Sequence, residues 1–467
     1  MTDDTTASDT PAADRTTDGR PAPPTDADWP PTDGHAHALT DRLSDQIDPI
    51  DSTDPAGALD DLSPLADRLD DARVVGLGEA THGTREFFQL KHRFLRLLVE
   101  ELSYRLFALE ANFSETLAID EYVVHGRGDP KSALDGIYFW TWDTEEVLAM
   151  IEWLREFNEG RPVEECVRFY GVDAQFTAGP AQALTEFFTE RDPATLDGHR
   201  RTLAMLADER LRDEDASDET MASRFADAAA LCDALDAYFE TDEATTSTDA
   251  GATADAGATA DAIALHRRHL RTLEQAIEGE RARNEENVEG LAENRDRAMA
   301  ENLAWILDHE PHDQIAVWAH DAHVQRDHRD EHWGDGAPMG AHLSDWYGDD
   351  YYVLGFDFAD GEFQAIVETD DGSELAECSL GPPPTDAATR LFASVDDPLW
   401  LLDFDDASGD ERLREYFETE RAVRSLGAVY DAEAEHERMH DEFVLPLAFD
   451  GIVFVAETTR ARPIERD

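Results

Sequence analysis

Residues 73–110, RVVGLGEATHGTREFFQLKHRFLRLLVEELSYRLFALE, predict the centre of the fold. Arg73–Gly78 is a short apolar run that ends in glycine, which is typical of a buried strand. From Thr84 onward, apolar side chains recur every three or four positions, which is typical of a helix with one buried face. Arg105–Glu110 is a second apolar run. The stretch therefore predicts a β–loop–α–β unit with two parallel strands and a right-handed crossover.

Ionisable side chains follow several of the predicted strands. Ligands of open α/β sheets bind beyond the carboxyl ends of the strands, so residues at these ends are candidates for a site. A lone histidine at a strand end is more often structural, but several such ends in one chain favour a common site. The candidates are Glu79, His82 and Glu110, from the stretch above, and His320 and His323, which follow the apolar run Gln314–Ala319.

The order of the patterns predicts an α/β fold with a mainly parallel central sheet flanked by helices and a helical insertion (lid) domain. Residues 1–35 are rich in Thr, Asp, Pro and Ala, and we expect a disordered acidic tail. Residues 36–180 would form the first part of the α/β core, and residues 313–467 the second part. Between them, residues 181–312 show helical periodicity, interrupted by a low-complexity stretch at 241–261 that predicts a mobile loop.

The net charge of −67 comes from 106 acidic and 39 basic residues spread along the whole chain. Only two of the basic residues are lysines, Lys91 and Lys131. Dispersed carboxylates with scarce lysine favour a surface adapted to high salt, where ions screen the repulsion, over an acidic partner-binding tail. This composition argues against nucleic acid as a partner, because binding a phosphate backbone needs clustered Lys and Arg.

The three cysteines, Cys166, Cys232 and Cys378, are widely spaced and match no zinc or disulfide pattern. This usage suits a reducing cytoplasm. The first residues lack the basic and apolar regions of a signal peptide, and no apolar run approaches membrane-spanning length. We therefore expect a cytoplasmic protein without a membrane partner.

Several common sites are absent from the sequence. It has no G-x-S-x-G elbow, no P-loop and no G-x-G-x-x-G motif, so neither a hydrolase serine nor nucleotide binding is indicated. The remaining chemistry is water activated by a histidine that a carboxylate holds, with backbone amides at the start of the helix after His82 available to a developing oxyanion. From spacing alone, Arg295 and Asp296 favour an exposed ion pair, and the aromatic run 137–142 favours core packing over a pocket wall.

Eight segments together resemble the erythromycin esterase family. They are GEATHGTREFFQLKHRFLRLLVEEL, FALEANFSE, WTWDTEEVLAMIEWLREFN, FYGVDAQF, ENRDRAMAENL, WAHDAHV, MGAHLSDWYGDDYYVLGFDF and FDGIVFVAET, in the order of the family, from about residue 60 to 460. The resemblance implies an α/β core with a helical lid. It also implies a hydrolase that opens macrolide lactone esters with water and forms no covalent enzyme intermediate.

The resemblance also implies roles for individual residues. His82 matches the general base, Glu79 the acid three residues before it, and Glu110 the glutamate that ends the second strand. His320 and His323 match the histidine pair of the WAH motif. Arg295 matches an arginine of the family, and Lys91 falls where many members carry Arg or Lys; both are candidates for binding the substrate or oxyanion. Asp321 stands where members commonly have Asn, from which we expect a raised pKa of the neighbouring histidines.

We therefore predict an ester hydrolase that acts on a small-molecule ester or lactone without a cofactor or metal. One alternative is a metal-dependent hydrolase, in which the same His and Glu side chains hold an ion that activates water. The other is a binding protein that keeps the fold without the chemistry. The sequence does not identify the natural substrate.

Overall fold

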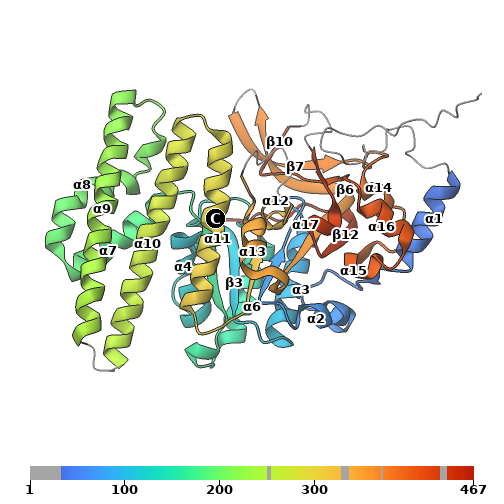
Figure 1. Ribbon diagram of the computed structural model, residues 1–467, viewed down its shortest axis with the longest axis horizontal. Coiled ribbons are helices and arrows are strands. Elements are labelled where there is room, and N and C mark those ends of the chain that lie inside the picture. Colours follow the sequence, from blue (N-terminus) through green and yellow to red (C-terminus); the bar gives the residue numbers. More distant parts are fainter. Residues whose placement is uncertain (1–32, 250–253, 328–335, 370–371, 432–438, 467) are drawn as a thin grey trace, which may run out of the picture.

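The computed structural model describes residues 33–249, 254–327, 336–369, 372–431 and 439–466. The predicted tail, residues 1–35, lies outside these ranges except for its last three residues, which begin helix α1 (Asp33–Ser44). The described part has the predicted α/β fold, with a large, mainly parallel sheet flanked by helices (Figure 1).

The sheet has the strand order β1-β8-β12-β6-β2-β5-β3-β4, with β7 and β10 also paired to β6. The six strands from β12 to β4 are parallel, whereas β8, β1 and β7 pair antiparallel with their neighbours. The strands are β1 (Asp48–Pro49), β2 (Val74–Leu77), β3 (Leu106–Asn112), β4 (Arg168–Asp173), β5 (Ile315–Trp318), β6 (Tyr351–Thr369), β7 (Gly372–Leu380), β8 (Leu399–Asp403), β10 (Val429–Tyr430) and β12 (Gly451–Thr458). A separate pair is formed by β9 (Arg421–Arg424) and β11 (His440–Phe443).

Strand β5 lies between β2 and β3, the two strands of the predicted β–loop–α–β unit. The unit is therefore parallel, as predicted, but its two strands are not neighbours. Since β5 follows the helical region in sequence, the chain returns to the middle of the sheet. This return places the residues after β5 between those after β2 and those at the end of β3.

Both faces of the central strands are covered, so their residues are buried without the alternation of a half-exposed strand. On β2, Val75 and Leu77 pack in the core beneath α3 (Arg85–Glu100), whereas Val74 points to the opposite face and packs with residues of α11 (Val288–His309). The amphipathic pattern of α3 thus arises because one face of this helix covers the sheet.

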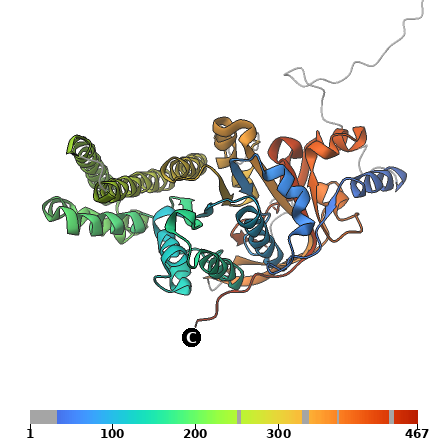
Figure 2. The same cartoon turned by 90° about the horizontal axis from the view of Figure 1, so that it is seen from below.

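Helices α7 (Ala178–Arg191), α8 (Pro193–Ala207), α9, α10 and α11 lie between β4 and β5, and the described residues of this stretch contain no strand. Figure 2 shows α7 to α10 extending away from the sheet, and these helices share their own apolar core. The segment 241–261 was predicted as a loop, and that prediction is wrong for most of its length. Helix α9 (Asp218–Asp249) continues into it and α10 (Ala254–Asn284) begins within it, because its alanines favour a helix even without large apolar side chains. Residues 250–253 lie outside the described part, and the role of the region as a lid stays a prediction.

The remaining helices surround the sheet or connect its strands. They are α2 (Ser63–Leu69), α4 (Phe113–His125), α5 (Pro130–Asp135), α6 (Glu145–Asn158), α12 (Asp321–Val324), α13 (Met339–Tyr347), α14 (Ala388–Phe392), α15 (Phe404–Ala407), α16 (Glu411–Phe417) and α17 (Leu445–Ala448). Among the described residues, none of the helices combines the length and apolarity that crossing a membrane requires.

Candidate active site

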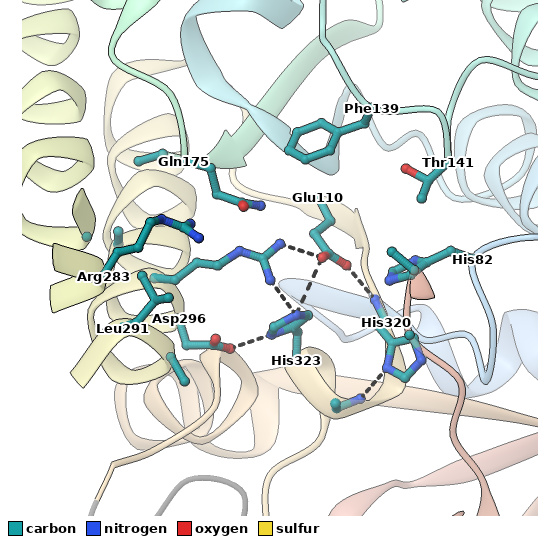
Figure 3. Close-up of a pocket in the computed structure, with 18 of the residues that line it drawn as sticks. His82, Glu110, Phe139, Thr141, Gln175, Arg283, Leu291, Asp296, His320 and His323 are labelled. Atoms are coloured by element: carbon teal, nitrogen blue, oxygen red, sulfur yellow. Dashed lines mark hydrogen bonds and ion pairs between the residues drawn. The ribbon is translucent and has the colours of Figure 1, made fainter. Parts of the chain in front are cut away.

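A cavity of about 580 Å³ lies at the carboxyl edge of the parallel strands, between the sheet and helices α10 and α11. Figure 3 shows its polar side chains converging from separate segments of the chain. Five of the seven residues predicted for the site line this cavity: His82, Glu110, Arg295, His320 and His323. The other two, Glu79 and Lys91, are fully buried behind it.

Glu79 holds His82 in one orientation. The His82 Nδ1 atom lies 2.8 Å from Glu79 Oε1, and the other carboxylate oxygen accepts a 2.6 Å hydrogen bond from the indole Nε1 of Trp318. Because ionised Glu79 can only accept, Nδ1 carries the hydrogen of the neutral imidazole and Nε2 has the free lone pair. His82 lines the cavity, so this arrangement leaves a basic nitrogen to act on a bound water or substrate.

The loop that carries His82 packs too closely against β6 for any side chain larger than that of glycine at position 83. A Cβ atom on Gly83 would lie 2.0 Å from the carbonyl oxygen of Gln364. The carbonyl oxygen of Gly83 accepts hydrogen bonds from the backbone of Gln364 and Ala461. These contacts fix the loop, and with it the position of His82.

Glu110 is the ionised centre of the site. One of its oxygens accepts a 2.6 Å hydrogen bond from Arg295 and the other a 2.8 Å bond from the backbone N–H of His320. Burial alone would raise the pKa of Glu110, but the neighbouring His323, Arg295 and His82 outweigh it electrostatically and hold that pKa well below the usual range. Glu110 has no hydrogen bond to His82, so its effect on that ring is electrostatic.

Arg295 and Asp296 are not the exposed pair that their spacing favours; that interpretation is wrong. Arg295 binds Asp173 and Glu110, and its Nη1 donates to His323 Nε2 at 2.9 Å. Asp296 is fully buried and accepts the Nδ1 hydrogen of His323 at 2.8 Å. Burial opposes protonation of His323, but the Asp296 and Glu110 carboxylates outweigh it and raise the pKa of this histidine.

His320 has both ring nitrogens occupied by the backbone. Its Nε2 lies 3.2 Å from the carbonyl oxygen of Leu426, to which it donates, and Nδ1 accepts from the N–H of Ala322 at 3.1 Å. Burial and the neighbouring His82 lower its pKa well below the ordinary value. The ring therefore stays neutral and fixed, with its centroid 4.9 Å from that of His82.

Lys91 contacts residues behind the site and does not line the cavity. Its Nζ donates to the carbonyl oxygen of Gly78 and lies 3.9 Å from Glu79 Oε2. Burial lowers the pKa of Lys91 to about 8, against the opposing effect of the Glu79 and Asp321 carboxylates. A direct contact between Lys91 and a substrate oxyanion, which the sequence suggested, does not fit this position.

Asp321 also points away from the histidines. Its carboxylate accepts from the backbone N–H of Phe356 and faces Gly78, and burial raises its pKa well above the ordinary value. The expectation that Asp321 raises the pKa of its histidine neighbours is wrong. The pKa of His320 is lowered, and that of His323 is raised by Asp296 and Glu110 instead.

Two of the backbone amides after His82 are already used. The N–H of Gly83 faces Thr81 Oγ1 at 3.3 Å, and the N–H of Arg85, the first residue of α3, donates to the carbonyl oxygen of Thr459. These bonds leave the two amides unavailable to an oxyanion, contrary to the expectation for these two positions. The guanidinium of Arg295 is the cationic group nearest to the Glu110–His323 centre that also lines the cavity.

Sequence reasoning left Asp173, Trp318 and Gln175 out of the site. Asp173 ends β4 and binds Arg295, and Gln175 lines the cavity while donating to Asp173 at 2.7 Å. The signal for Asp173 was present, because it too is a carboxylate at a strand end. The role of Trp318 had no such signal, since a tryptophan within an apolar strand is equally consistent with core packing.

The aromatic run 137–142 contributes both to core packing and to the wall of the pocket. Trp142 is buried against Trp318, with ring centroids 5.1 Å apart, and donates to the carbonyl oxygen of Glu110. Phe139 and Thr141 line the cavity (Figure 3), and so does Trp142. Phe139 and Trp142 add to the apolar part of the lining, which also includes Val288 and Leu291.

The His and Glu side chains do not fit the metal-dependent alternative. Across the described ranges, no group of three or more His, Cys, Asp or Glu side chains has the arrangement to hold an ion. The physical reason is that the required atoms are engaged: His82 Nδ1 by Glu79, both nitrogens of His320 by the backbone, and Glu110 by Arg295. None of the three cysteines lines the cavity.

Fold and site together define an α/β protein with a helical insertion and a buried histidine–carboxylate centre. The sequence profile of the erythromycin esterase family matches residues 99–458, most of the chain. The chain belongs to the erythromycin esterase family.

Two curated relatives carry hydrolase names. Erythromycin esterase type II of Escherichia coli is 32% identical over 161 residues, a match that spans 33% of this chain and only 37% of that protein. YbfO of Bacillus subtilis (strain 168), named as a hydrolase, is 24% identical over 430 residues, covering 88% of this chain and 89% of its own length. Family membership and these names support a hydrolase.

Three solved structures share the fold. A Bacillus cereus protein superposes with a TM-score of 0.77 at 21% identity, over 92% of this chain and 99% of that one. A succinoglycan biosynthesis protein gives 0.75 at 18% identity, over 93% and 100%. The erythromycin esterase mutant EreC in its open conformation gives 0.64 at 17% identity, over 88% and 96%. At these identities the likeness shows the fold alone.

Proposed function

We propose that this protein hydrolyses a carboxylic ester or lactone bond of a small-molecule substrate, with water activated by His82 and without a covalent enzyme intermediate. One observation carries the proposal. Glu79 accepts the Nδ1 hydrogen of His82, which leaves the basic Nε2 at the cavity while the nearby Glu110–Arg295 pair supplies fixed charge.

In the first step, a water molecule attacks the carbonyl carbon and passes a proton to His82 Nε2. The new C–O bond converts the carbonyl oxygen to an oxyanion. In the second step, the bond to the alcohol oxygen breaks and the His82 imidazolium returns the proton to that oxygen. The products are a carboxylic acid and an alcohol, or a single hydroxy acid from a lactone, and His82 is again neutral.

Arg295 stabilises the oxyanion in this mechanism. Its Nε and Nη2 atoms are engaged by Asp173 and Glu110, and one Nη1 hydrogen goes to His323. A guanidinium has five N–H groups, so one Nη1 hydrogen remains for a substrate oxygen. Asp173, Glu110 and His323 fix the plane of the guanidinium, so little reorganisation is needed when charge develops.

The test is a panel of lactones, including macrolides, and simple aryl esters assayed with the parent protein and with His82→Ala. We expect turnover of at least one panel member that falls by about 10²–10⁴-fold in His82→Ala. The matched control is His125→Ala, on the exposed end of α4 outside the cavity, which should keep the parental rate. Turnover that survives in His82→Ala would refute the mechanism, and a panel without turnover would favour a binding protein.

A further inference from the structure

The wall of the cavity opposite His82 is one face of helix α10. The residues of α10 that line the cavity recur at helical spacing: Gln275, Ala276, Gly279, Glu280 and Arg283. In Figure 3, Arg283 and Leu291 lie at one end of the site and His82 at the other, with Glu110 and His323 between them. A substrate that reaches both ends would contact α10 with a part that does not react.

Two buried acceptor atoms on this face have no hydrogen-bond partner among the described residues. The amide nitrogen of Gln275 donates to Glu301 at 3.0 Å, but its oxygen Oε1 accepts nothing. Glu280 uses Oε1 to bind Arg212, whereas Oε2 has only a 3.5 Å ion pair with the half-exposed Arg283. Gln275 is 5% exposed and Glu280 is 2% exposed.

Such atoms are informative because buried polar atoms in folded proteins are nearly always hydrogen-bonded. A third unpaired acceptor, Asp296 Oδ2, belongs to the same cavity lining. Among the described residues, the buried side-chain atoms of the lining that lack a hydrogen bond are thus all acceptors, so the missing hydrogen-bond partners are donors.

The helix also leaves room beside these atoms. Position 279 is glycine, and a Cβ atom added there would meet only Leu291 Cδ1, at 3.7 Å. Ala276 lies one turn before Glu280 on the same face and is also a small residue. The gap between Gln275 and Glu280 can therefore accept a ligand group directly against the helix.

We infer that Gln275, Gly279 and Glu280 form a subsite that binds a hydrogen-bond donor, a hydroxyl or an ammonium group, on the non-reacting part of the substrate. The inference rests on the proposed ester hydrolysis for the position of the reacting bond. Acceptor atoms that include a carboxylate disfavour an anionic group at this position, so the subsite selects donor-bearing over acidic substrates.

The test uses phenyl esters of straight-chain acids of increasing length that end in an ammonium, hydroxyl, methyl or carboxylate group. At a chain length that spans the cavity, we expect kcat/KM for the ammonium and hydroxyl esters to exceed that of the methyl ester by about tenfold or more. The carboxylate ester should be the poorest. Glu280→Gln should abolish the ammonium preference, and Gln275→Leu should reduce the hydroxyl preference.

Two further variants complete the design. Gly279→Leu fills the gap with a good helix former and should remove both preferences. Glu278→Gln removes a charge from the same helix outside the cavity lining and should leave them intact. A parent protein without any preference, or preferences that persist in Glu280→Gln and Gly279→Leu, would overturn the inference.

Binding measurements separate this inference from the proposed function. The corresponding phenyl ethers cannot be hydrolysed, and calorimetry reports their affinity whether or not any ester is turned over. Donor-ended ethers that bind more tightly than the methyl-ended ether, with a difference lost in Glu280→Gln, would support the subsite even if hydrolysis failed. Equal affinities would refute it even if hydrolysis succeeded.

Discussion

Glu79→Gln should inactivate the protein because it moves the ring hydrogen of neutral His82 from Nδ1 to Nε2. Two groups donate to the Glu79 carboxylate, His82 Nδ1 at 2.8 Å and Trp318 Nε1 at 2.6 Å. A glutamine has one acceptor oxygen and one NH₂ group, so it can satisfy only one of the two donors. If its oxygen faces Trp318, its NH₂ faces His82 and selects the tautomer with the hydrogen on Nε2, which cannot take a proton from water.

The magnitude follows from the same contacts. If the glutamine oxygen instead faces His82, the buried indole N–H is left without a partner, which costs about 1–3 kcal/mol. Lys91, 3.9 Å from the same carboxylate oxygen, adds to the preference for an oxygen there. The inactive tautomer is therefore favoured, and kcat/KM should fall by about 10²–10⁴-fold, the usual contribution of a general base.

The assay is kcat/KM on the best ester, with denaturant unfolding to show that the fold persists. In a Trp318→Phe background the indole donor is absent, so Glu79→Gln should have a smaller effect, with a coupling of about 1–3 kcal/mol between the two changes. The control background is Trp400→Phe, another fully buried tryptophan, on β8 at the other side of the sheet. Equal effects of Glu79→Gln in all three backgrounds would refute the reasoning.

Three further predictions follow from the surroundings of the site. Lys91→Met should lower kcat and leave KM unchanged, because Lys91 contacts Glu79 but not the cavity; a raised KM would indicate a direct substrate contact. Dialysis against a chelator should leave kcat/KM unchanged. If kcat/KM fell on dialysis and recovered when a divalent metal was added, the metal-dependent alternative would be favoured. Burial, together with His266, lowers the pKa of His269 to about 3. Below pH 6.5 the unfolded chain therefore binds a proton at this histidine that the folded chain does not bind until about pH 3. The free energy of unfolding falls as the pH drops from 6.5 toward 3. His269→Gln should remove about 2 kcal/mol of this loss at about pH 5, measured by urea unfolding at neutral and acidic pH.

Much of the parallel sheet could be predicted because its strands are continuous apolar runs with ionisable residues at their ends. This pattern was enough to bring His82, Glu110 and His320 to one edge. The insertion of β5 between β2 and β3 could not be predicted, since strand order depends on long-range packing rather than on local sequence. Likewise, β6 was predicted as two strands, and β7, whose residues are mostly exposed, was missed.

Roles within the site were harder to predict than its members. Lys91 and Arg295 are both cations near the predicted edge, yet only Arg295 lines the cavity. Helical spacing alone does not say whether a side chain points to the site or beneath it. Asp296 was expected to be exposed, and its burial follows from contacts with His323 and Met339, which are distant in sequence.

The most direct test of the water-activation mechanism is chemical rescue of His82→Ala. This change removes the ring that lines the cavity while Glu79 and Trp318 remain paired behind it. If His82 is the base, added imidazole should restore part of the lost kcat/KM in a saturable manner, while an equal concentration of a non-basic azole should not. Parental activity in His82→Ala without any addition would contradict the mechanism.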